Sequence, residues 1–319
     1  MPLIPLDCPS CGANLTVDSN KDAAICEYCG KPYVVKDAIV HNYINNVTNI
    51  TADTVNVYSQ KDFEIRGGVL EKYNGESVDV IIPDNVKDIG GEAFKGLSIE
   101  SVKMPSSVTS IGSSAFAYCR YLKNIEFSSG LKKIYGEAFI GCVSLKTLRI
   151  PNGVTTIQYQ AFADCSDLEF VTIPVSLQSI GQGTFNNCIK LKDITIPEGV
   201  VCIEQSAFFN CRSLTSVTFP RSLKRIEESA FMGCDNLTKI ARSGGTIEIG
   251  SNAFYPCSKQ ITLVTSEGSF EVYQHELGRP IEEIKKEYFM KENKCTSCGG
   301  DFTGLIMKKC SKCGKSKDY

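Results

Sequence analysis

Apolar side chains recur every 23 residues along most of the chain. An isoleucine, a phenylalanine, a cysteine and a leucine keep fixed positions within each period. The isoleucines are Ile111, Ile134, Ile157, Ile180, Ile203, Ile226 and Ile249, and the phenylalanines are Phe116, Phe139, Phe162, Phe185, Phe208, Phe231 and Phe254. The cysteines are Cys119, Cys142, Cys165, Cys188, Cys211, Cys234 and Cys257, and the leucines are Leu122, Leu145, Leu168, Leu191, Leu214 and Leu237. An earlier unit is one residue shorter and carries Leu97 in place of the cysteine. Several columns in register over this length establish an internal repeat.

Within each unit the pattern predicts two short extended segments and one compact turn. Apolar and polar residues alternate over Leu122–Phe127, which is typical of a half-buried strand. A proline such as Pro151 or Pro174 follows in several units and ends the strand, because it cannot donate a hydrogen bond to a neighbour. Val154–Ile157 exemplifies the second extended segment. The following Ser-x-Ala-Phe-x-x-Cys stretch predicts a short helix or 3₁₀ turn.

A single unit of this kind cannot bury its apolar side, whereas stacked units can. The sequence therefore predicts an α/β repeat fold with short strands and short helical turns. This fold requires equivalent side chains to lie above one another in shared interior columns, as for Phe139, Phe162 and Phe185.

The unit resembles a known family. Residues 104–119 follow the pattern Met-Pro-x-x-Val-Thr-x-Ile-Gly-x-x-Ala-Phe-x-x-Cys, which is similar to the bacterial leucine-rich repeats of the BspA type. The resemblance covers residues 63–275, and residues 67–75 look like the hairpin that caps the family's first unit. It implies a curved, right-handed solenoid that contacts other proteins. Many members are cell-surface adhesins, a role that we keep as an alternative because this chain lacks an export signal and adds cysteine pairs.

The segments around the repeat are predicted separately. Residues 37–62 alternate near Ile50 to Val57 and form either a first strand or an extended linker. Residues 276–294 contain Pro280 at a first-turn position and predict an amphipathic helix that seals the last unit. Its apolar face would consist of Ile281, Ile284, Tyr288 and Phe289.

Composition narrows the class of protein and its compartment. Of 319 residues, 42% are hydrophobic and 22% are charged, which are the proportions of a folded domain. The net charge of -2 creates no general attraction to nucleic acid or to an anionic membrane. No apolar run approaches the roughly 20 residues that span a bilayer. Because Met1–Asp7 lacks the features of a signal peptide, we expect a cytoplasmic protein without membrane contact.

Eight of the sixteen cysteines form Cys-x-x-Cys pairs, two pairs in residues 1–36 and two in residues 295–319. A glycine follows the second cysteine of every pair. Four thiolates close a tetrahedron around Zn²⁺ with no open position, so each segment is predicted to be a zinc ribbon holding one structural ion. Such small segments depend on the metal for folding free energy. Iron in a rubredoxin-like site and a redox dithiol are the alternatives. The predicted ligands are Cys8, Cys11, Cys26, Cys29, Cys295, Cys298, Cys310 and Cys313.

The seven cysteines of the repeat have two interpretations. They could form a metal array or redox sensor, or each could fill a small slot facing the core, as free cysteine often does. Strand stacking separates neighbouring thiols by roughly 5 Å, which favours the core slot. Cys202 lies outside this column, beside Ile203, and could be exposed.

No catalytic residues are predicted. The two histidines, His41 and His275, flank the repeat, and there is no phosphate-binding loop or dinucleotide fingerprint. We therefore expect a non-catalytic scaffold whose outward strand residues bind a protein partner of unknown identity. The candidate partner-binding residues are Glu126, Arg149, Phe170, Thr172, Asp193 and Thr195. Phe170 is either an aromatic anchor or a lone exposed apolar residue.

A nucleic-acid-associated factor is the alternative function. The C-terminal ribbon carries Lys308, Lys309 and Lys312, which could contact phosphate. Neither ribbon combines arginine with stacked aromatic side chains, so this signal is weak.

Overall fold

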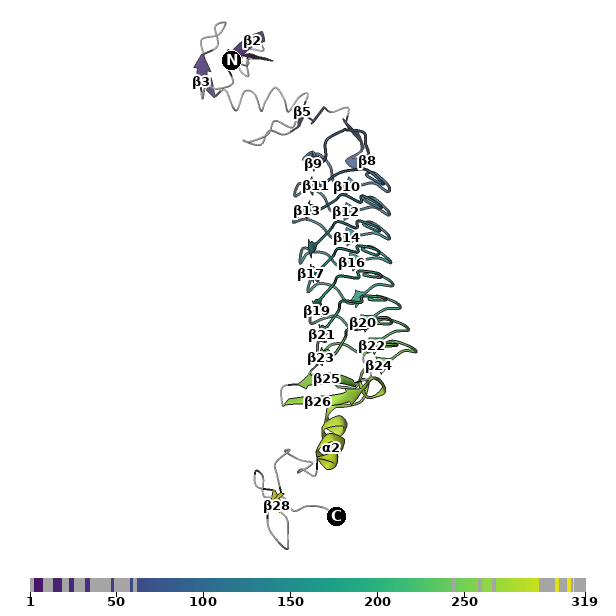
Figure 1. The fold of residues 1–319 in the computed structure, drawn as a ribbon. Helices are drawn as coiled ribbons and strands as arrows, with labels where there is room; N and C mark the ends of the chain where they lie inside the picture. Colours follow the sequence, from purple (N-terminus) through teal and green to yellow (C-terminus); the bar gives the residue numbers. More distant parts are fainter. Residues whose placement is uncertain are drawn as a thin grey trace.

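The protein is described by a computed structural model that covers residues 62–292 apart from 243–244, 258–259 and 266–267. It also describes the backbone of short strands before and after this range, and Lys312. The repeats form stacked coils, and the stack makes an elongated solenoid (Figure 1). The predicted linker strand at residues 50–57 and most of the two cysteine-rich segments lie outside the described residues.

Each coil contributes one strand to each of two parallel rows. The first strand row contains β9 (Asp79–Ile81), β11 (Ser101–Lys103), β13 (Asn124–Glu126), β15 (Thr147–Arg149), β17 (Phe170–Thr172), β19 (Asp193–Thr195), β21 (Ser216–Thr218), β23 (Lys239–Ala241) and β25 (Gln260–Thr265). The second strand row contains β8 (Val69–Tyr73), β10 (Asp88–Ile89), β12 (Ser110–Ile111), β14 (Lys133–Ile134), β16 (Thr156–Ile157), β18 (Ser179–Ile180), β20 (Cys202–Ile203), β22 (Arg225–Ile226) and β24 (Glu248–Ile249). Register follows the repeat, since Ile111 pairs with Ile134 and Ile134 with Ile157.

The hydrogen-bonded rows are interrupted. The first row divides into sheets of order β13-β11-β9, β15-β17 and β19-β21-β23-β25-β26, and the second divides after β16. The remaining elements are β1 (Leu3–Asp7), β2 (Asn14–Asp18), β3 (Ala23–Ile25), β4 (Pro32–Val34), β5 (Val47–Thr48), β6 (Tyr58–Ser59), β7 (Phe63–Arg66), β26 (Gly268–Tyr273), η2 (Gln274–Glu276), α2 (Ile281–Lys291), β27 (Phe302–Thr303) and β28 (Lys309–Cys310).

The phenylalanine column forms a continuous stack through the core. The rings of Phe139 and Phe162 lie 5.3 Å apart and 8° from parallel, and those of Phe162 and Phe185 lie 5.8 Å apart at 10°. The same stacking runs without a break from Phe94 to Phe254. Every ring in this stack is buried. The predicted interior column is therefore confirmed.

The predicted short helical turn is wrong. Ser114 and Tyr118 have φ values of 55° and 60°, in the left-handed region, which interrupts any helical run. Alternate amides also point in different directions. The Ala117 amide donates to the Ser114 carbonyl within its own coil at 3.0 Å, whereas the Phe116 amide donates to the Ala138 carbonyl of the next coil at 2.7 Å. The turn thus completes its hydrogen bonds through the stack, and the fold is a β-solenoid with little helix.

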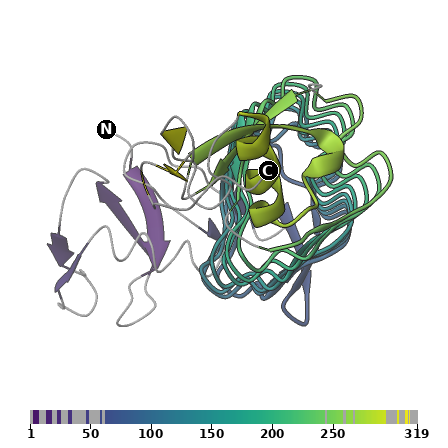
Figure 2. The same ribbon diagram turned by 90° about the horizontal axis from the view of Figure 1, so that it is seen from below.

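Both ends of the described stack are capped. At one end β7 pairs antiparallel with β8, at the position of the predicted hairpin. At the other end β26 pairs antiparallel with β25, and α2 lies across the last coil (Figures 1 and 2). Ile284 of α2 is buried, and Tyr288 and Phe289 place their rings 5.2 and 5.9 Å from that of Phe270. The helix forms where its apolar pattern predicted it. Within the described residues, no helix has the length and apolar character needed to cross a bilayer.

Candidate interaction surface

The outward residues of the first strand row form the candidate surface. In β15 and β19 the middle residues, Leu148 and Ile194, are buried in the core, and the residues on either side are exposed. This alternation follows from the two-residue period of a strand, which places neighbouring side chains on opposite faces. The six predicted partner-binding residues are all exposed: Glu126, Arg149, Phe170, Thr172, Asp193 and Thr195.

The register brings some of these residues together and separates others. Arg149 pairs directly with Thr172, and Thr147 pairs with Phe170. Arg149 and Phe170 are therefore diagonal neighbours on adjacent strands. Glu126 lies across a break in the row, in the sheet of β9, β11 and β13. The structure thus centres the candidate surface on β15 and β17.

Phe170 is the exposed aromatic of this row, with half of its surface accessible. The ammonium of Lys192 lies 5.2 Å from the centre of its ring, within the range of a cation–π contact. The same ammonium bonds to the Glu169 carboxylate at 2.5 Å. This bond is the main reason that the pKa of Glu169 lies below its ordinary value, with smaller contributions from Lys146 and Lys190. Phe170 therefore lies against Lys192, and two further lysines act on the neighbouring Glu169.

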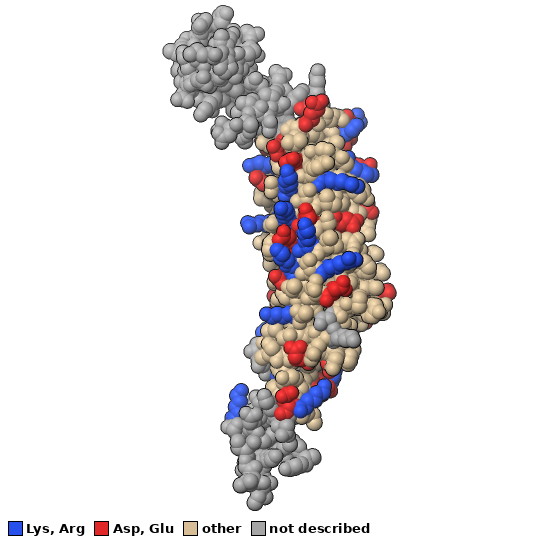
Figure 3. Space-filling view, in the orientation of Figure 1, with Lys and Arg blue, Asp and Glu red and all other residues tan. Residues whose placement is uncertain are grey.

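Figure 3 shows Lys and Arg side chains interspersed with Asp and Glu over one face of the solenoid, and several of these charges form ion pairs. The ion pairs join consecutive coils: Lys123 with Glu100 at 2.8 Å, Lys103 with Glu126 at 3.2 Å, and Lys190 with Asp167 at 2.6 Å. Sequence reasoning missed these lysines as part of the surface. Their signal was present, because Glu100, Lys123, Lys146, Glu169 and Lys192 occupy one column directly before the strands.

Two cations of the coil next to Phe170 differ from Lys123, Lys190 and Lys192 in having no ion pair. Lys146 and Arg149 are exposed, and neither forms an ion pair with any described residue. Both lie on the coil of β15. The backbone amide of Phe170 donates to the Lys146 carbonyl at 3.3 Å, so the unpaired cations and the exposed ring belong to adjacent coils.

The repeat cysteines fill core slots, as predicted. All seven are free and buried, and each thiol donates to the carbonyl of a phenylalanine of the preceding coil. In one example the Cys119 sulfur lies 3.0 Å from the Phe94 oxygen. Burial raises the pKa of the Cys119, Cys165, Cys211 and Cys257 thiols to about 12. Such thiols are protonated and unreactive at neutral pH.

Cys202 is buried, contrary to the expectation that it could be exposed. The residue is 8% accessible and lies in β20, where it pairs with Arg225 of the following coil. The sulfur contacts the Glu227 carboxylate at 3.6 Å. Burial and the Glu227 charge raise the pKa of this thiol, so it is not an activated nucleophile.

The predicted zinc ligands lie outside the described residues, except that the backbone of Cys310 belongs to β28 and pairs with Phe302. Within residues 62–292, excluding the gaps named above, no three His, Cys, Asp or Glu side chains gather in a metal-binding arrangement. The zinc assignment remains a prediction from the spacing of the cysteines.

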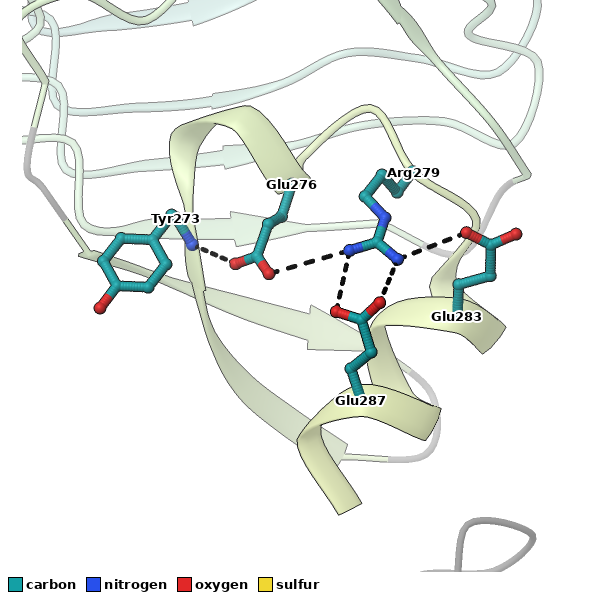
Figure 4. A network of polar contacts seen from close by, with 5 residues as sticks. All are labelled: Tyr273, Glu276, Arg279, Glu283 and Glu287. Carbon is teal, nitrogen blue, oxygen red and sulfur yellow. Dashed lines mark hydrogen bonds and ion pairs between the residues drawn. The ribbon is translucent and has the colours of Figure 1, made fainter. Parts of the chain in front are cut away.

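A polar cluster fixes the cap at the end of the stack (Figure 4). The guanidinium of Arg279 bonds to both carboxylate oxygens of Glu287 at 2.6 and 2.9 Å, and approaches Glu283 at 3.5 Å and Glu276 at 4.0 Å. Glu276 also accepts a hydrogen bond from the Tyr273 amide at 2.7 Å. The cluster links the end of β26 to α2 through Glu276 and Arg279, so its role is structural.

The sequence and structure are similar to those of known repeat proteins. The family described as "BspA type Leucine rich repeat region" matches six copies over residues 73–169 and 155–296. A crystal structure of a leucine-rich repeat protein from Bacteroides ovatus is 30% identical, with a TM-score of 0.53, and the match covers 69% of this chain and 62% of that one. The T. pallidum leucine-rich repeat protein is 28% identical over 62% of this chain and 87% of its own, with a TM-score of 0.47. This chain thus spans less than two thirds of the Bacteroides ovatus protein. No curated protein matches it.

Proposed function

Because the chain belongs to the family of BspA-type leucine-rich repeat proteins, we propose that it is a non-catalytic scaffold that binds a protein partner through its first strand row. The observation that carries this proposal is Phe170, a half-exposed aromatic ring on a regular parallel sheet. Large aromatic side chains dominate the binding energy of many protein interfaces. Arg149 and Thr172 lie beside Phe170 and can supply polar contacts at the rim of the interface.

The stacked core favours this role because it fixes the surface in advance. Binding costs less when the interacting groups are already ordered. The outward residues are attached to strands whose middle residues, such as Leu148 and Ile194, are buried. Phe170 is further restrained by its contact with Lys192. A partner would therefore meet a surface that needs little rearrangement.

The test is affinity capture with the full chain followed by mass spectrometry, comparing the wild type with Phe170→Ala and Tyr159→Ala. Both side chains are 50% exposed, but Tyr159 lies in a turn and not in the strand row. A partner that is recovered with wild type and Tyr159→Ala, and reduced at least about tenfold with Phe170→Ala, supports the proposal. Equal recovery with all three proteins contradicts it.

We also propose that each terminal four-cysteine segment holds one structural Zn²⁺ ion. The support is the spacing of the four Cys-x-x-Cys pairs and the glycine that follows each one. Metal analysis of the purified chain should give two zinc ions, and one after Cys8→Ser with Cys11→Ser. Fewer than one zinc ion per wild-type chain would overturn the assignment, and an equivalent amount of iron would indicate a rubredoxin-like site.

The cytoplasm is the compartment that we propose for the scaffold. The support is the set of eight described cysteines, which are all free thiols and suit a reducing environment. Cell fractionation distinguishes this from the adhesin alternative. Recovery of the chain with the cell envelope, accessible to protease in intact cells, would favour an adhesin.

A further inference from the structure

We infer that the partner presents an acidic segment in which carboxylates flank an apolar side chain, with the apolar group against Phe170 and the carboxylates at Lys146 and Arg149. This inference rests on the proposed function of the first strand row. It adds the chemistry of the partner, which the fold alone does not determine.

The first argument is the pairing of charges. Lys103, Lys123, Lys190 and Lys192 each bond to an acidic side chain of a neighbouring coil or strand. Lys146 and Arg149 occupy equivalent outward positions without such a partner among the described residues. An acidic ligand would therefore gain two charge contacts without first breaking an ion pair. The local positive charge also speeds the encounter with an acidic partner.

The second argument is position. Lys146 directly precedes β15 and Arg149 ends it, so the two residues lie about 10 Å apart at 3.3 Å per residue. Phe170 lies on the adjacent strand, opposite Thr147 and so between the two cations along the strand direction. Neighbouring strands lie about 4.8 Å apart. An extended segment with a carboxylate on either side of an apolar residue matches this arrangement.

The surrounding acidic residues disfavour nucleic acid as the partner. Glu100, Glu126, Asp167, Glu169 and Asp193 are distributed over the same side of the solenoid. A nucleic acid carries one phosphate for about every 3.4 Å of each strand, so a continuous backbone would meet these carboxylates on successive coils. A short acidic peptide can place its charges only where the cations are unpaired.

The test uses the full chain and three fluorescein-labelled peptides with the core sequences Glu-Glu-Phe-Glu-Glu, Gln-Gln-Phe-Gln-Gln and Glu-Glu-Ser-Glu-Glu. Fluorescence anisotropy at low salt should show the tightest binding for the first peptide. Replacing either its charges or its aromatic ring should weaken binding at least about tenfold. The affinity should also fall as salt is added, because exposed charge contacts are screened. Equal binding of the glutamate and glutamine peptides would overturn the inference.

Matched variants locate the binding. Lys146→Glu with Arg149→Glu should reduce binding of the Glu-Glu-Phe-Glu-Glu peptide at least about tenfold. The control is Lys133→Glu with Lys224→Glu, which makes the same charge change at two exposed lysines on the side of the second strand row. Lys133 lies in β14, and Lys224 directly precedes β22. The affinity of this control should stay within about threefold of the wild type. Equal losses in both variants would show a general charge effect and overturn the inference.

Two further outcomes separate this inference from the scaffold proposal. If the captured partner depends on Phe170 but is unaffected by the Lys146 and Arg149 reversals, the scaffold proposal stands and the acidic segment is wrong. If a labelled uridine 20-mer binds more tightly than the peptide and is lost in the same double variant, the partner class is nucleic acid and the inference is overturned.

Discussion

The thiol of Cys142 donates to the backbone carbonyl of Phe116, one coil earlier, across 3.1 Å. The same contact recurs at every cysteine of the repeat. It explains why a cysteine fits this position. The side chain fills a small buried slot, and its weak donor adds a second hydrogen bond to a carbonyl that also accepts from a backbone amide. Alanine would leave a cavity and remove this hydrogen bond, whereas the Phe116 carbonyl would still accept from the Cys119 amide at 3.1 Å.

Burial of these thiols predicts that stability decreases at high pH. The folded pKa of Cys165 is raised to about 12, above its unfolded value of about 8.5, because burial disfavours the thiolate. The folded state then binds more protons than the unfolded state, so the free energy of unfolding falls as pH rises between these two values. Each such thiol should contribute a slope of about 1.4 kcal/mol per pH unit in this window. Urea unfolding between pH 8 and pH 11 measures it.

Cys165→Ala is the control for this prediction. The variant should be less stable at pH 8, because it leaves a cavity, but its stability should fall less steeply with pH. An unchanged slope would mean that Cys165 does not titrate on unfolding in this range.

Truncation of a stacked phenylalanine should destabilise the whole solenoid. Phe185 is fully buried between Phe162 and Phe208, so Phe185→Ala should lower the free energy of unfolding by about 3–5 kcal/mol. Phe170→Ala removes the same group from an exposed position and should cost less than about 1 kcal/mol. Chemical denaturation of the two variants checks this. Similar losses would contradict the placement of either ring.

Close packing between coils predicts a strong effect at Gly112. A Cβ atom there would lie 2.6 Å from the Gly91 nitrogen and 2.7 Å from the Gly90 carbonyl carbon, both backbone atoms of the preceding coil. Gly112→Ala must therefore separate two coils, at a cost of about 1–3 kcal/mol. A Cβ at Gly245 meets no atom within 4 Å, so Gly245→Ala should change stability by less than about 0.5 kcal/mol. Thermal unfolding of both variants provides the comparison, and equal midpoints would refute it.

The cap predicts a local effect of Arg279. Its bonds to Glu287 raise the pKa of Arg279 and lower that of Glu287. Arg279→Gln should release α2, and hydrogen exchange of the amides of Ile281–Lys291 should become faster while the core amides are unchanged. Because the folded pKa of Glu287 is depressed, its stabilising contribution is present above its ordinary value of about 4.3 and is lost as pH falls below it. Wild-type α2 should therefore also exchange faster in acid, after correction for the intrinsic rate.

Lys95→Gln tests whether that effect is specific. It removes an exposed ion pair with Glu92, far from the cap, and should leave exchange of α2 unchanged. If Arg279→Gln also leaves it unchanged, packing of Ile284, Tyr288 and Phe289 alone holds the helix.

The interior of the solenoid was predictable because it repeats. Columns such as Phe139 and Cys142 recur at one spacing, and only stacking places equivalent side chains in one environment. The turn was not predictable from the same pattern. Small and apolar residues at one-turn spacing also suit a helix, and the left-handed conformations at Ser114 and Tyr118 depend on amides that donate to the next coil. That contact is a property of the stack and not of a single unit.

The candidate surface was predictable only in part. Alternation along the strands identified Phe170 and Arg149 as outward residues. It could not show that Lys192 lies against the Phe170 ring, or that Lys146 is left unpaired while its neighbours form ion pairs. Those relationships depend on contacts that long side chains make between consecutive coils. A pattern within one unit does not specify such contacts.

The sharing of turn amides between coils has a consequence for how the chain can change its length. Half of the donors in a turn, such as the Phe116 amide, are satisfied only by the coil that follows. Duplication or loss of a whole 23-residue unit keeps every donor matched, so the stack can lengthen or shorten in complete steps. An insertion of a few residues within a turn would shift the donors out of phase with their acceptors. Polar groups in the interior would then be left without hydrogen-bond partners. We therefore expect the length of the solenoid to change during evolution by whole repeat units.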